Sequence, residues 1–193
     1  MEFVKEFAIF LYKSGIMRFG DYTLASGKKS PYYVDLRQVP GHPHEFRQMI
    51  KHLRGMIAKD GFADSIASVP TGGTIIAAAL AVESVMPLVY VRAKPKEYGT
   101  SRRVEGVIRK GSRAVMVDDV ATTGGSVADA IAALSDEGIA VSDAYVIVDR
   151  LEGASERLAE MGTRLHSVLD VRKIAQILGA EGLVEPGILE KFG

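Results

Sequence analysis

The 193-residue sequence contains no cysteine. Disulfide bonds, zinc–thiolate sites and thiol nucleophiles are therefore excluded, and we expect a protein of a reducing compartment, the cytoplasm. The sequence also has no excess of charge of either sign, because 24 Lys and Arg residues balance 24 Asp and Glu residues. A protein that binds nucleic acid through its overall charge is therefore not expected, and any basic surface must be local.

Long apolar segments are missing as well. The longest run, Thr74 to Val82, is rich in alanine and far shorter than the ~20 residues that cross a membrane. The start of the chain carries Glu2, Lys5 and Glu6 among its apolar residues, which is unlike a secretory signal and indicates a helix. We therefore expect no membrane association. With 47% hydrophobic and 25% charged residues, the chain fits one globular domain over residues 1–193.

Short β-branched runs alternate with segments of helical spacing. The expected strands are 65–69, 88–91, 114–117, 144–148 and 165–169, and the expected helices are 44–59, 73–85, 126–137, 152–161 and 170–178. This alternation predicts an α/β fold with a mainly parallel central sheet flanked by helices, and with ligands at the carboxyl ends of the strands. Residues 15–40 break the rhythm and predict a small antiparallel hairpin or flap.

The most specific motif is AVMVDDVATTGGS, residues 114–126. A strand leads into Asp118 and Asp119, then into a Thr- and Gly-rich turn, then into a helix. Backbone N–H groups at such a turn bind anions, and Thr122, Thr123 and Ser126 add hydroxyl donors. Adjacent carboxylates suit two neighbouring sugar hydroxyls or a hydrated cation. The motif therefore indicates a site for a sugar phosphate, with a purely structural strand-to-helix turn as the alternative.

Two further segments carry possible anion contacts. The turn PTGGT, residues 70–74, opens the next helix in the same way, although alone it is equally compatible with a structural role. Residues 92–110 hold seven Lys and Arg residues against two Glu residues, a net charge of +5. Pro95 and Gly99 disfavour regular structure there, which predicts an exposed, mobile basic loop. Such a loop is either simply solvated or able to stabilise an anionic leaving group.

The 114–126 motif resembles the phosphoribosyl-pyrophosphate signature of the type I phosphoribosyltransferases. It has neither the Walker-type Gly-Lys-Ser/Thr nor the GxGxxG of dinucleotide-binding proteins, so ATPase and dehydrogenase activities are not expected. The resemblance implies that Asp118 and Asp119 hold the ribose hydroxyls and that Thr71, Gly72 and Gly73 contact the pyrophosphate. The residues it assigns to the sugar phosphate are Val120, Ala121, Thr122, Thr123, Gly124, Gly125 and Ser126.

Three other segments resemble the orotate-specific members of that family. VRAKPKEYGTSRRVEG, residues 91–106, is similar to their catalytic loop, which implies catalytic roles for Arg92, Lys96 and Tyr98, the first two also touching phosphoribosyl pyrophosphate. Residues 22–37 resemble their amino-terminal hood, and residues 146–168 a further orotate-binding segment. The orotate-binding residues implied are Tyr33, Val34, Thr122 and Arg150. The chain departs from the family where Ala25, Gly72 and Ala93 replace frequent lysines.

The resemblance implies an enzyme that transfers ribose 5-phosphate from phosphoribosyl pyrophosphate to orotate, giving orotidine 5′-monophosphate and pyrophosphate in pyrimidine biosynthesis. It further implies Mg²⁺ held mainly by substrate and water, without a metal site of the protein's own. A homodimer is implied too, in which the basic loop completes the neighbouring site. The alternatives are a type I transferase for another base and a non-catalytic sensor of phosphoribosyl pyrophosphate. The neutral charge and Lys96 favour an enzyme over a DNA-binding sensor.

Overall fold

The computed structural model describes residues 2–23, 27–61, 63–94, 103–107, 109–185 and 187–190. Lys96 and Tyr98, two of the expected catalytic residues, lie outside these ranges. The chain forms two compact units, one from residues 1–49 with 169–193 and one from residues 50–168. In the described part of the chain, no helix is long and apolar enough to span a membrane.

The larger unit is built on a six-stranded sheet in the order β5-β4-β3-β6-β7-β8. Its strands are β3 (Ser65–Ser68), β4 (Leu88–Val91), β5 (Val104–Glu105), β6 (Arg113–Ala121), β7 (Ala140–Asp149) and β8 (Arg164–Asp170). The β3–β4, β3–β6 and β6–β7 pairs are parallel, and β4–β5 is antiparallel. The expected mainly parallel sheet is confirmed, and so is its flanking by helices.

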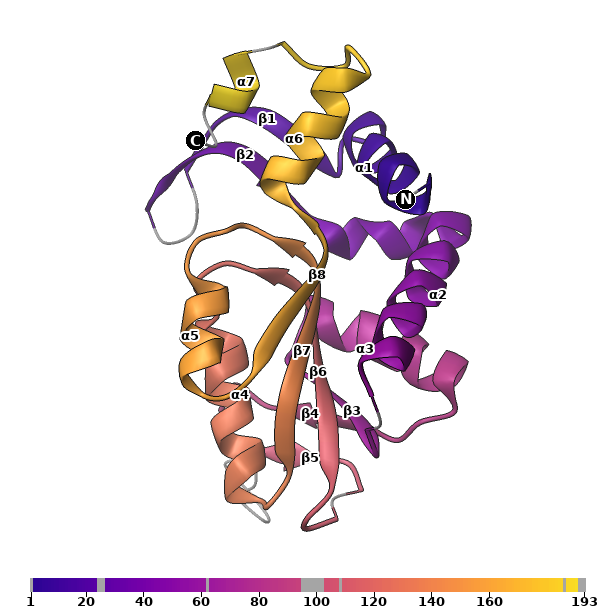
Figure 1. Ribbon diagram of the computed structural model, residues 1–193, viewed down its shortest axis with the longest axis vertical. Helices are drawn as coiled ribbons and strands as arrows, with labels where there is room; N and C mark the ends of the chain where they lie inside the picture. The colour runs from indigo at the N-terminus through magenta and orange to yellow at the C-terminus, as the bar shows by residue number, and fades with distance from the viewer. Residues whose placement is uncertain are drawn as a thin grey trace. The chain divides into compact units, whose positions relative to one another are not determined.

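Helices cover both faces of this sheet. They are α2 (Pro43–Asp60), α3 (Gly72–Ser84), α4 (Gly125–Asp136) and α5 (Ala154–Glu160). Figure 1 shows α4 and α5 on one face of the sheet and α3 on the other. Each of α3 and α4 follows directly on a parallel strand, β3 and β6, and therefore begins at the carboxyl end of the sheet, where ligands of α/β proteins bind.

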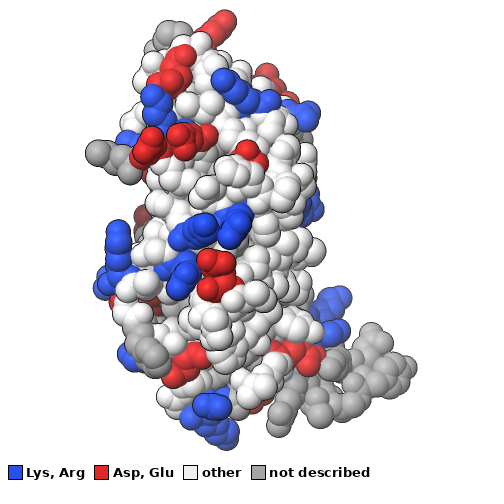
Figure 2. All heavy atoms as spheres, turned by 90° about the vertical axis from the view of Figure 1, so that its right-hand side faces the viewer, with Lys and Arg blue, Asp and Glu red and all other residues white. Residues whose placement is uncertain are grey.

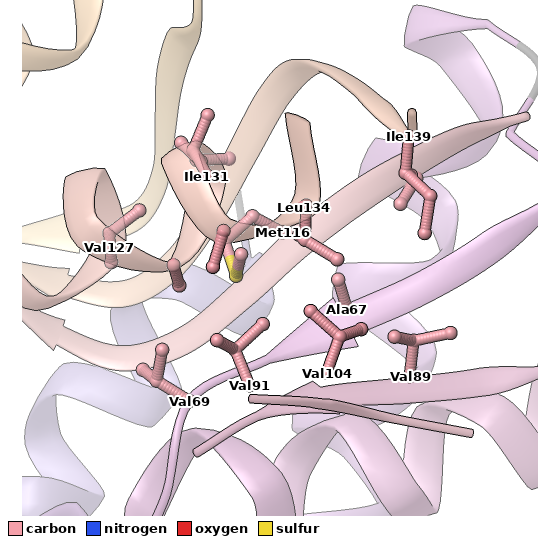
Figure 3. Packing of buried hydrophobic residues seen from close by; sticks show 14 of the residues in the cluster. Ala67, Val69, Val89, Val91, Val104, Met116, Val127, Ile131, Leu134 and Ile139 are labelled. Carbon is pink, nitrogen blue, oxygen red and sulfur yellow. The ribbon is translucent and has the colours of Figure 1, made fainter. Parts of the chain in front are cut away.

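The core between α4 and the sheet follows the periodicity of the sequence. Val127, Ala130, Ile131 and Leu134 lie on one face of α4 and are all buried, as their spacing predicts. They pack against strand residues that include Met116, which is fully buried (Figure 3). Burying each large side chain contributes roughly 1.5–3 kcal/mol. This packing fixes the start of α4, and hence the turn before it, against the sheet.

The smaller unit contains a two-stranded antiparallel sheet and helices from both ends of the chain. Its elements are α1 (Glu2–Lys13), β1 (Met17–Thr23), β2 (Lys29–Val34), the 3₁₀ helix η1 (Leu36–Gly41), α6 (Val171–Ala180) and α7 (Gly187–Glu190). The β1–β2 register runs from Met17 opposite Val34 to Thr23 opposite Lys29, which confirms the hairpin expected within residues 15–40. An ion pair of 2.6 Å joins Lys5 to Glu181.

The structure differs from the sequence-based expectation at three strands. The strand expected over 144–148 begins earlier, at Ala140 of β7. The strand expected to end at residue 117 continues to Ala121, because Val120 and Ala121 pair with Val148 and Asp149 of β7. The acidic pair therefore lies within β6 rather than after it. The expectation of an exposed loop over residues 92–110 was wrong at Val104, which is 3% exposed and pairs with Val91. Because Val104 is buried against the sheet, the end of this polar segment forms an edge strand.

Candidate active site

The two carboxylates of the site stand near the carboxyl end of β6. Asp118 is buried, with 8% of its surface exposed, and Asp119 is partly buried. Asp118 Oδ1 accepts a hydrogen bond of 2.9 Å from the Asp119 N–H, and Asp119 Oδ1 accepts one of 2.9 Å from the Val120 N–H. These bonds to the backbone fix both side chains, so the pair is oriented before any ligand binds.

The 70–74 turn lies directly against this acidic pair. A Cβ atom on Gly73 would come within 2.5 Å of Asp118 Oδ1, and one on Gly72 would overlap the carboxylate of Asp119. The Gly73 N–H also donates a hydrogen bond to Asp118. Thr71 is the exposed residue that precedes α3. The two glycines thus leave room for the carboxylates, a structural role that their sequence context did not reveal.

Burial and mutual repulsion disfavour the charged form of the acidic pair. Burial raises the pKa of Asp118 well above its usual value, and the neighbouring charge of Asp119 raises it further. The hydrogen bonds from the Asp119 and Gly73 N–H groups act in the opposite direction without cancelling the shift. Groups that donate hydrogen bonds to Asp118, such as sugar hydroxyls, would stabilise its charged form.

A pocket of about 170 Å³ follows the acidic pair at the start of α4. Its lining consists of Asp118 and the continuous run Val120, Ala121, Thr122, Thr123, Gly124, Gly125, Ser126 and Val127. The structure therefore brings together the residues that the sequence assigned to a sugar phosphate. The first N–H groups of α4 have no partner within the helix, since its first hydrogen bond runs from the Ala128 N–H to the Gly124 carbonyl at 2.8 Å.

Gly124 is required at this turn for two reasons. Its φ is +71°, in the left-handed region that residues with a side chain seldom adopt. A Cβ atom there would also come within 3.1 Å of the Cα of Ala154, the first residue of α5. The turn can therefore bring its N–H groups close to a ligand while α5 packs behind it.

Arg92 lies where β4 ends, at the edge of the sheet. Its Nη1 is 3.9 Å from Glu105 Oε1, and its buried Nε has no hydrogen-bond partner among the described residues. The Arg92 N–H donates to the Arg103 carbonyl at 2.8 Å, and the Arg103 side chain binds Asp129 of α4 through both Nη atoms, at 3.2 and 2.5 Å. Sequence reasoning did not single out this link between the sheet edge and α4.

The residues expected to contact the base are distributed over both units. Arg150 is 8% exposed directly after β7, where its Nε donates to Glu152 at 2.9 Å and its N–H to the Ala121 carbonyl at 2.9 Å. It is therefore anchored beside the strand that ends in the pocket. Tyr33 and Val34 belong to β2 of the smaller unit, and Tyr33 is 38% exposed with its ring against that of Tyr22.

The donor set limits what metal the site could hold. Within the described ranges, no group of three or more His, Asp or Glu side chains is arranged to bind a metal ion. Two neighbouring carboxylates fit a hydrated Mg²⁺ ion that takes its other ligands from water and a diphosphate, because Mg²⁺ keeps several waters in such sites.

Comparison with known proteins agrees with this geometry. A family model of the phosphoribosyl transferase domain matches residues 42–171. The chain is 48% identical to the orotate phosphoribosyltransferase of Cenarchaeum symbiosum, over 99% of this chain and 97% of that one. The crystal structure of orotate phosphoribosyltransferase from Aeropyrum pernix superposes with a TM-score of 0.81 at 41% identity, covering 92% of this chain and 99% of that chain. The Mycobacterium tuberculosis enzyme in complex with phosphoribosyl pyrophosphate gives 0.73 at 26% identity, covering 90% and 99%. The resemblance read from residues 114–126 is thus confirmed, and the chain belongs to the phosphoribosyltransferase family and, within it, to the orotate phosphoribosyltransferases.

Proposed function

We propose that this protein transfers the 5-phosphoribosyl group of phosphoribosyl pyrophosphate to orotate, giving orotidine 5′-monophosphate and pyrophosphate. The observation that carries the proposal is the pocket in which a fixed carboxylate meets an anion-binding turn at the start of a helix. Family membership supports the reaction. The absence of cysteine supports a cytoplasmic setting for it.

Each part of the donor has a matching part of the site. Asp118 and Asp119 would accept hydrogen bonds from the two ribose hydroxyls. The backbone N–H groups and hydroxyls of residues 120–126 would hold the sugar phosphate. Thr71, Gly72 and Gly73 would contact the pyrophosphate, and their closeness to the acidic pair supports this placement.

The reaction itself requires positioning and stabilisation of charge. A ring nitrogen of orotate attacks the anomeric carbon while the bond from that carbon to the pyrophosphate oxygen breaks. Positive charge then develops on the ribose and negative charge on the leaving group. Arg92, Lys96 and Tyr98 would stabilise the departing pyrophosphate, since cations and donors are most effective where charge develops. Holding both reactants in line supplies much of the remaining acceleration.

A magnesium ion fits this arrangement as a partner of the donor rather than of the protein. Asp118 and Asp119 would hold its water ligands, and the diphosphate would supply others. When bound, the ion would offset the negative charge of the diphosphate.

Recognition of orotate would involve Arg150, Thr122, Tyr33 and Val34. A guanidinium can engage the orotate carboxylate or a ring carbonyl with two donors, and the ion pair with Glu152 supports a fixed orientation of Arg150. Thr122 would reach the base from the pocket lining. Tyr33 and Val34 of the hairpin would border the ring as part of a hood.

A homodimer, with the basic loop of one chain, residues 92–110, completing the site of the other, is part of the proposal. The face of α3 opposite the core supports it, because Ile75, Val82 and Val85 are 39%, 82% and 92% exposed although all three are apolar. In Figure 2, which shows the side of the molecule where α3 lies in Figure 1, uncharged surface extends between scattered charges of both signs. Burying such a face against a second copy would remove apolar surface from water.

Pyrophosphate release tests the proposal when it is measured with orotate, uracil, adenine and hypoxanthine as separate acceptors and Mg²⁺ present. We expect turnover with orotate alone. Turnover with a purine only would replace the substrate, and binding of phosphoribosyl pyrophosphate without turnover on any base would favour a sensor. Mixing a Lys96→Ala chain with an Asp119→Ala chain tests the shared site, because mixed dimers should regain activity if the basic loop serves the neighbour.

A further inference from the structure

A cation stands beside the pocket at the start of α4. The guanidinium of Arg157, on α5, donates from Nη1 to the Thr123 carbonyl at 3.3 Å. The same Nη1 is 3.1 Å from where a Cβ atom on Gly125 would lie. Arg157 therefore reaches the 122–126 turn at two successive places, from a helix that sequence reasoning did not connect with it.

Packing holds α5 in the place that this contact requires. Ala154, one helical turn before Arg157, is 1% exposed and clusters with Ala121 and Val146 of the sheet. Its Cα lies 3.1 Å from the position that a Cβ atom on Gly124 would occupy. Because residues three apart lie on the same side of a helix, this buried contact directs Arg157 toward the turn as well.

The Arg157 guanidinium has N–H donors available for a ligand. Arg157 itself is exposed, and in the part of the chain that the structure describes it forms no ion pair with a carboxylate. A guanidinium has five N–H donors, and the bond to the Thr123 carbonyl uses one of them. The remaining donors form the planar fork that binds phosphate oxygens in pairs.

The pocket, in contrast, lacks positive charge. Its lining residues, Asp118 and 120–127, include no Lys or Arg, and Asp118 adds a carboxylate near the space where an anion would bind. Backbone N–H groups and hydroxyls can bind a phosphate dianion, while the charge of that carboxylate opposes the binding. A cation at the rim of the pocket would do so.

We propose that Arg157 is a binding residue for the 5-phosphate of the sugar, a proposal that rests on the proposed function of the 122–126 turn. The guanidinium supplies the positive charge that the turn itself lacks, and it bridges the turn carbonyl and the phosphate oxygens. Its effect is confined to ligands that carry the sugar phosphate. The binding of pyrophosphate, which we assign to the 70–74 turn, does not depend on it.

Calorimetric titration of the full chain with ribose 5-phosphate and, separately, with inorganic pyrophosphate tests the proposal. The variants are Arg157→Ala and Arg157→Lys. The matched control is Arg47→Ala, an exposed arginine of helix α2 to which no ligand contact is assigned. We expect Arg157→Ala to weaken ribose 5-phosphate binding about tenfold, equivalent to ~1.4 kcal/mol, with pyrophosphate affinity changed less than about twofold. Arg157→Lys should retain part of the affinity, and Arg47→Ala should bind both ligands like the parent.

Equal ribose 5-phosphate affinity of the parent and Arg157→Ala would overturn the proposal, as would an equal loss for both ligands. The titrations need no catalysis, so they separate this inference from the proposed reaction. A parent that binds ribose 5-phosphate through Arg157 but releases no pyrophosphate with orotate would refute the reaction and leave the phosphate contact standing. A parent that binds no ribose 5-phosphate would refute both. Unchanged thermal unfolding of Arg157→Ala, expected for an exposed side chain, excludes misfolding as the cause of a loss.

Discussion

At the residue scale, two positions without side chains determine where the carboxylates of the site can stand. We expect Gly72→Ala to displace the Asp119 carboxylate, because the new methyl group would overlap it. Affinity for phosphoribosyl pyrophosphate should fall at least tenfold in calorimetry, and overpacking should destabilise the fold by ~1–3 kcal/mol. Gly55→Ala is the control, since a Cβ atom there meets nothing within 4 Å and helix α2 should gain ~0.5–1 kcal/mol. Parent-like affinity of Gly72→Ala would show that ligand binding does not require the space that Gly72 leaves for the Asp119 carboxylate.

The charge of Asp118 is expected to aid ligand binding but to destabilise the folded protein. Its raised pKa means that the folded state disfavours the charged form, so the ionised side chain destabilises the protein at every pH above its usual titration range. Asn keeps an oxygen to accept the hydrogen bonds from the Asp119 and Gly73 N–H groups but carries no charge. We expect Asp118→Asn to raise Tm at pH 7 by about 2–4 °C, or ~1 kcal/mol. Near pH 3, where the carboxyl group is protonated in both states, the gain should vanish.

The same variant should bind phosphoribosyl pyrophosphate at least tenfold more weakly, because one acceptor for the ribose hydroxyls loses its charge. Differential scanning calorimetry at both pH values and titration with the donor give the two results. A lower Tm at pH 7 would contradict the electrostatic account, even if binding were lost.

At the element scale, the short strand β5 is held by a contact from outside the sheet. Arg103 fixes its end by binding Asp129 of α4 with both Nη atoms and the Arg92 carbonyl with Nε at 3.1 Å. The hydrogen bond from Arg103 lowers the pKa of Asp129, so the pair is fully charged at neutral pH. Asp129→Asn should therefore speed hydrogen exchange at the Arg92 amide several-fold, because that amide donates to the Arg103 carbonyl.

Little change in global stability is expected from that substitution, since an exposed ion pair contributes ~0–1 kcal/mol. Glu137→Gln, at the far end of α4, removes the same charge and should leave the Arg92 amide unaffected. Exchange at that amide as slow in Asp129→Asn as in the parent would mean that β5 holds its place without Asp129.

The elements that the sequence predicted well are those whose signal is local. The four apolar positions of α4 recur at helical spacing. The Asp118–Asp119 pair precedes a turn in which the backbone conformation favours glycine. The contacts that escaped prediction join residues distant in sequence. Nothing in the residues around Arg157 indicates that packing of Ala154 against Gly124 brings it to the 122–126 turn.

Boundaries failed for the same reason. Residues 118–121 read as the start of a turn because they include two acids, yet pairing with β7 keeps them in the strand. Val104 reads as part of a polar loop until its partner Val91 is known. Strand limits depend on the neighbouring strand, which a single sequence does not display.

At the scale of the whole molecule, acid stability should depend on a cluster remote in sequence from the site. His166 Nε2 lies 2.8 Å from Asp143 Oδ1, and the Tyr145 hydroxyl donates to Asp60 at 2.8 Å beneath the stacked ring of His166. Burial acts to raise the pKa of Asp143, but hydrogen bonds from His166 and Ser142 outweigh it and lower the pKa. The stability contributed by Asp143 is thus present above the usual range of its titration and lost as pH falls through the lowered pKa.

Urea unfolding at pH 7, 5, 4 and 3 measures this contribution. Asp143→Asn should cost about 1 kcal/mol at pH 7, and this deficit should shrink as the pH falls from 5 to 3. Asp136→Asn, an exposed acid at the end of α4, is the control and should follow the parent throughout. A deficit of Asp143→Asn that stays constant from pH 7 to pH 3 would assign the loss to packing rather than to charge.

The proposed dimer predicts that assembly depends on the exposed apolar face of α3. If two copies bury this face against each other, a two-fold axis brings the same residues of both chains together, so one substitution places two like charges in the contact. Val82 is 82% exposed in the single chain, and Val82→Glu should therefore leave the fold intact while opposing association by several kcal/mol. We expect sedimentation velocity to show a dimer for the parent and a monomer for Val82→Glu at the same concentration. Ser135→Glu, which adds the same charge to an exposed position of α4, should remain dimeric. A dimeric Val82→Glu chain would exclude the α3 face as the contact, whereas a monomeric parent would exclude the dimer and, with it, the proposal that the basic loop completes the neighbouring site.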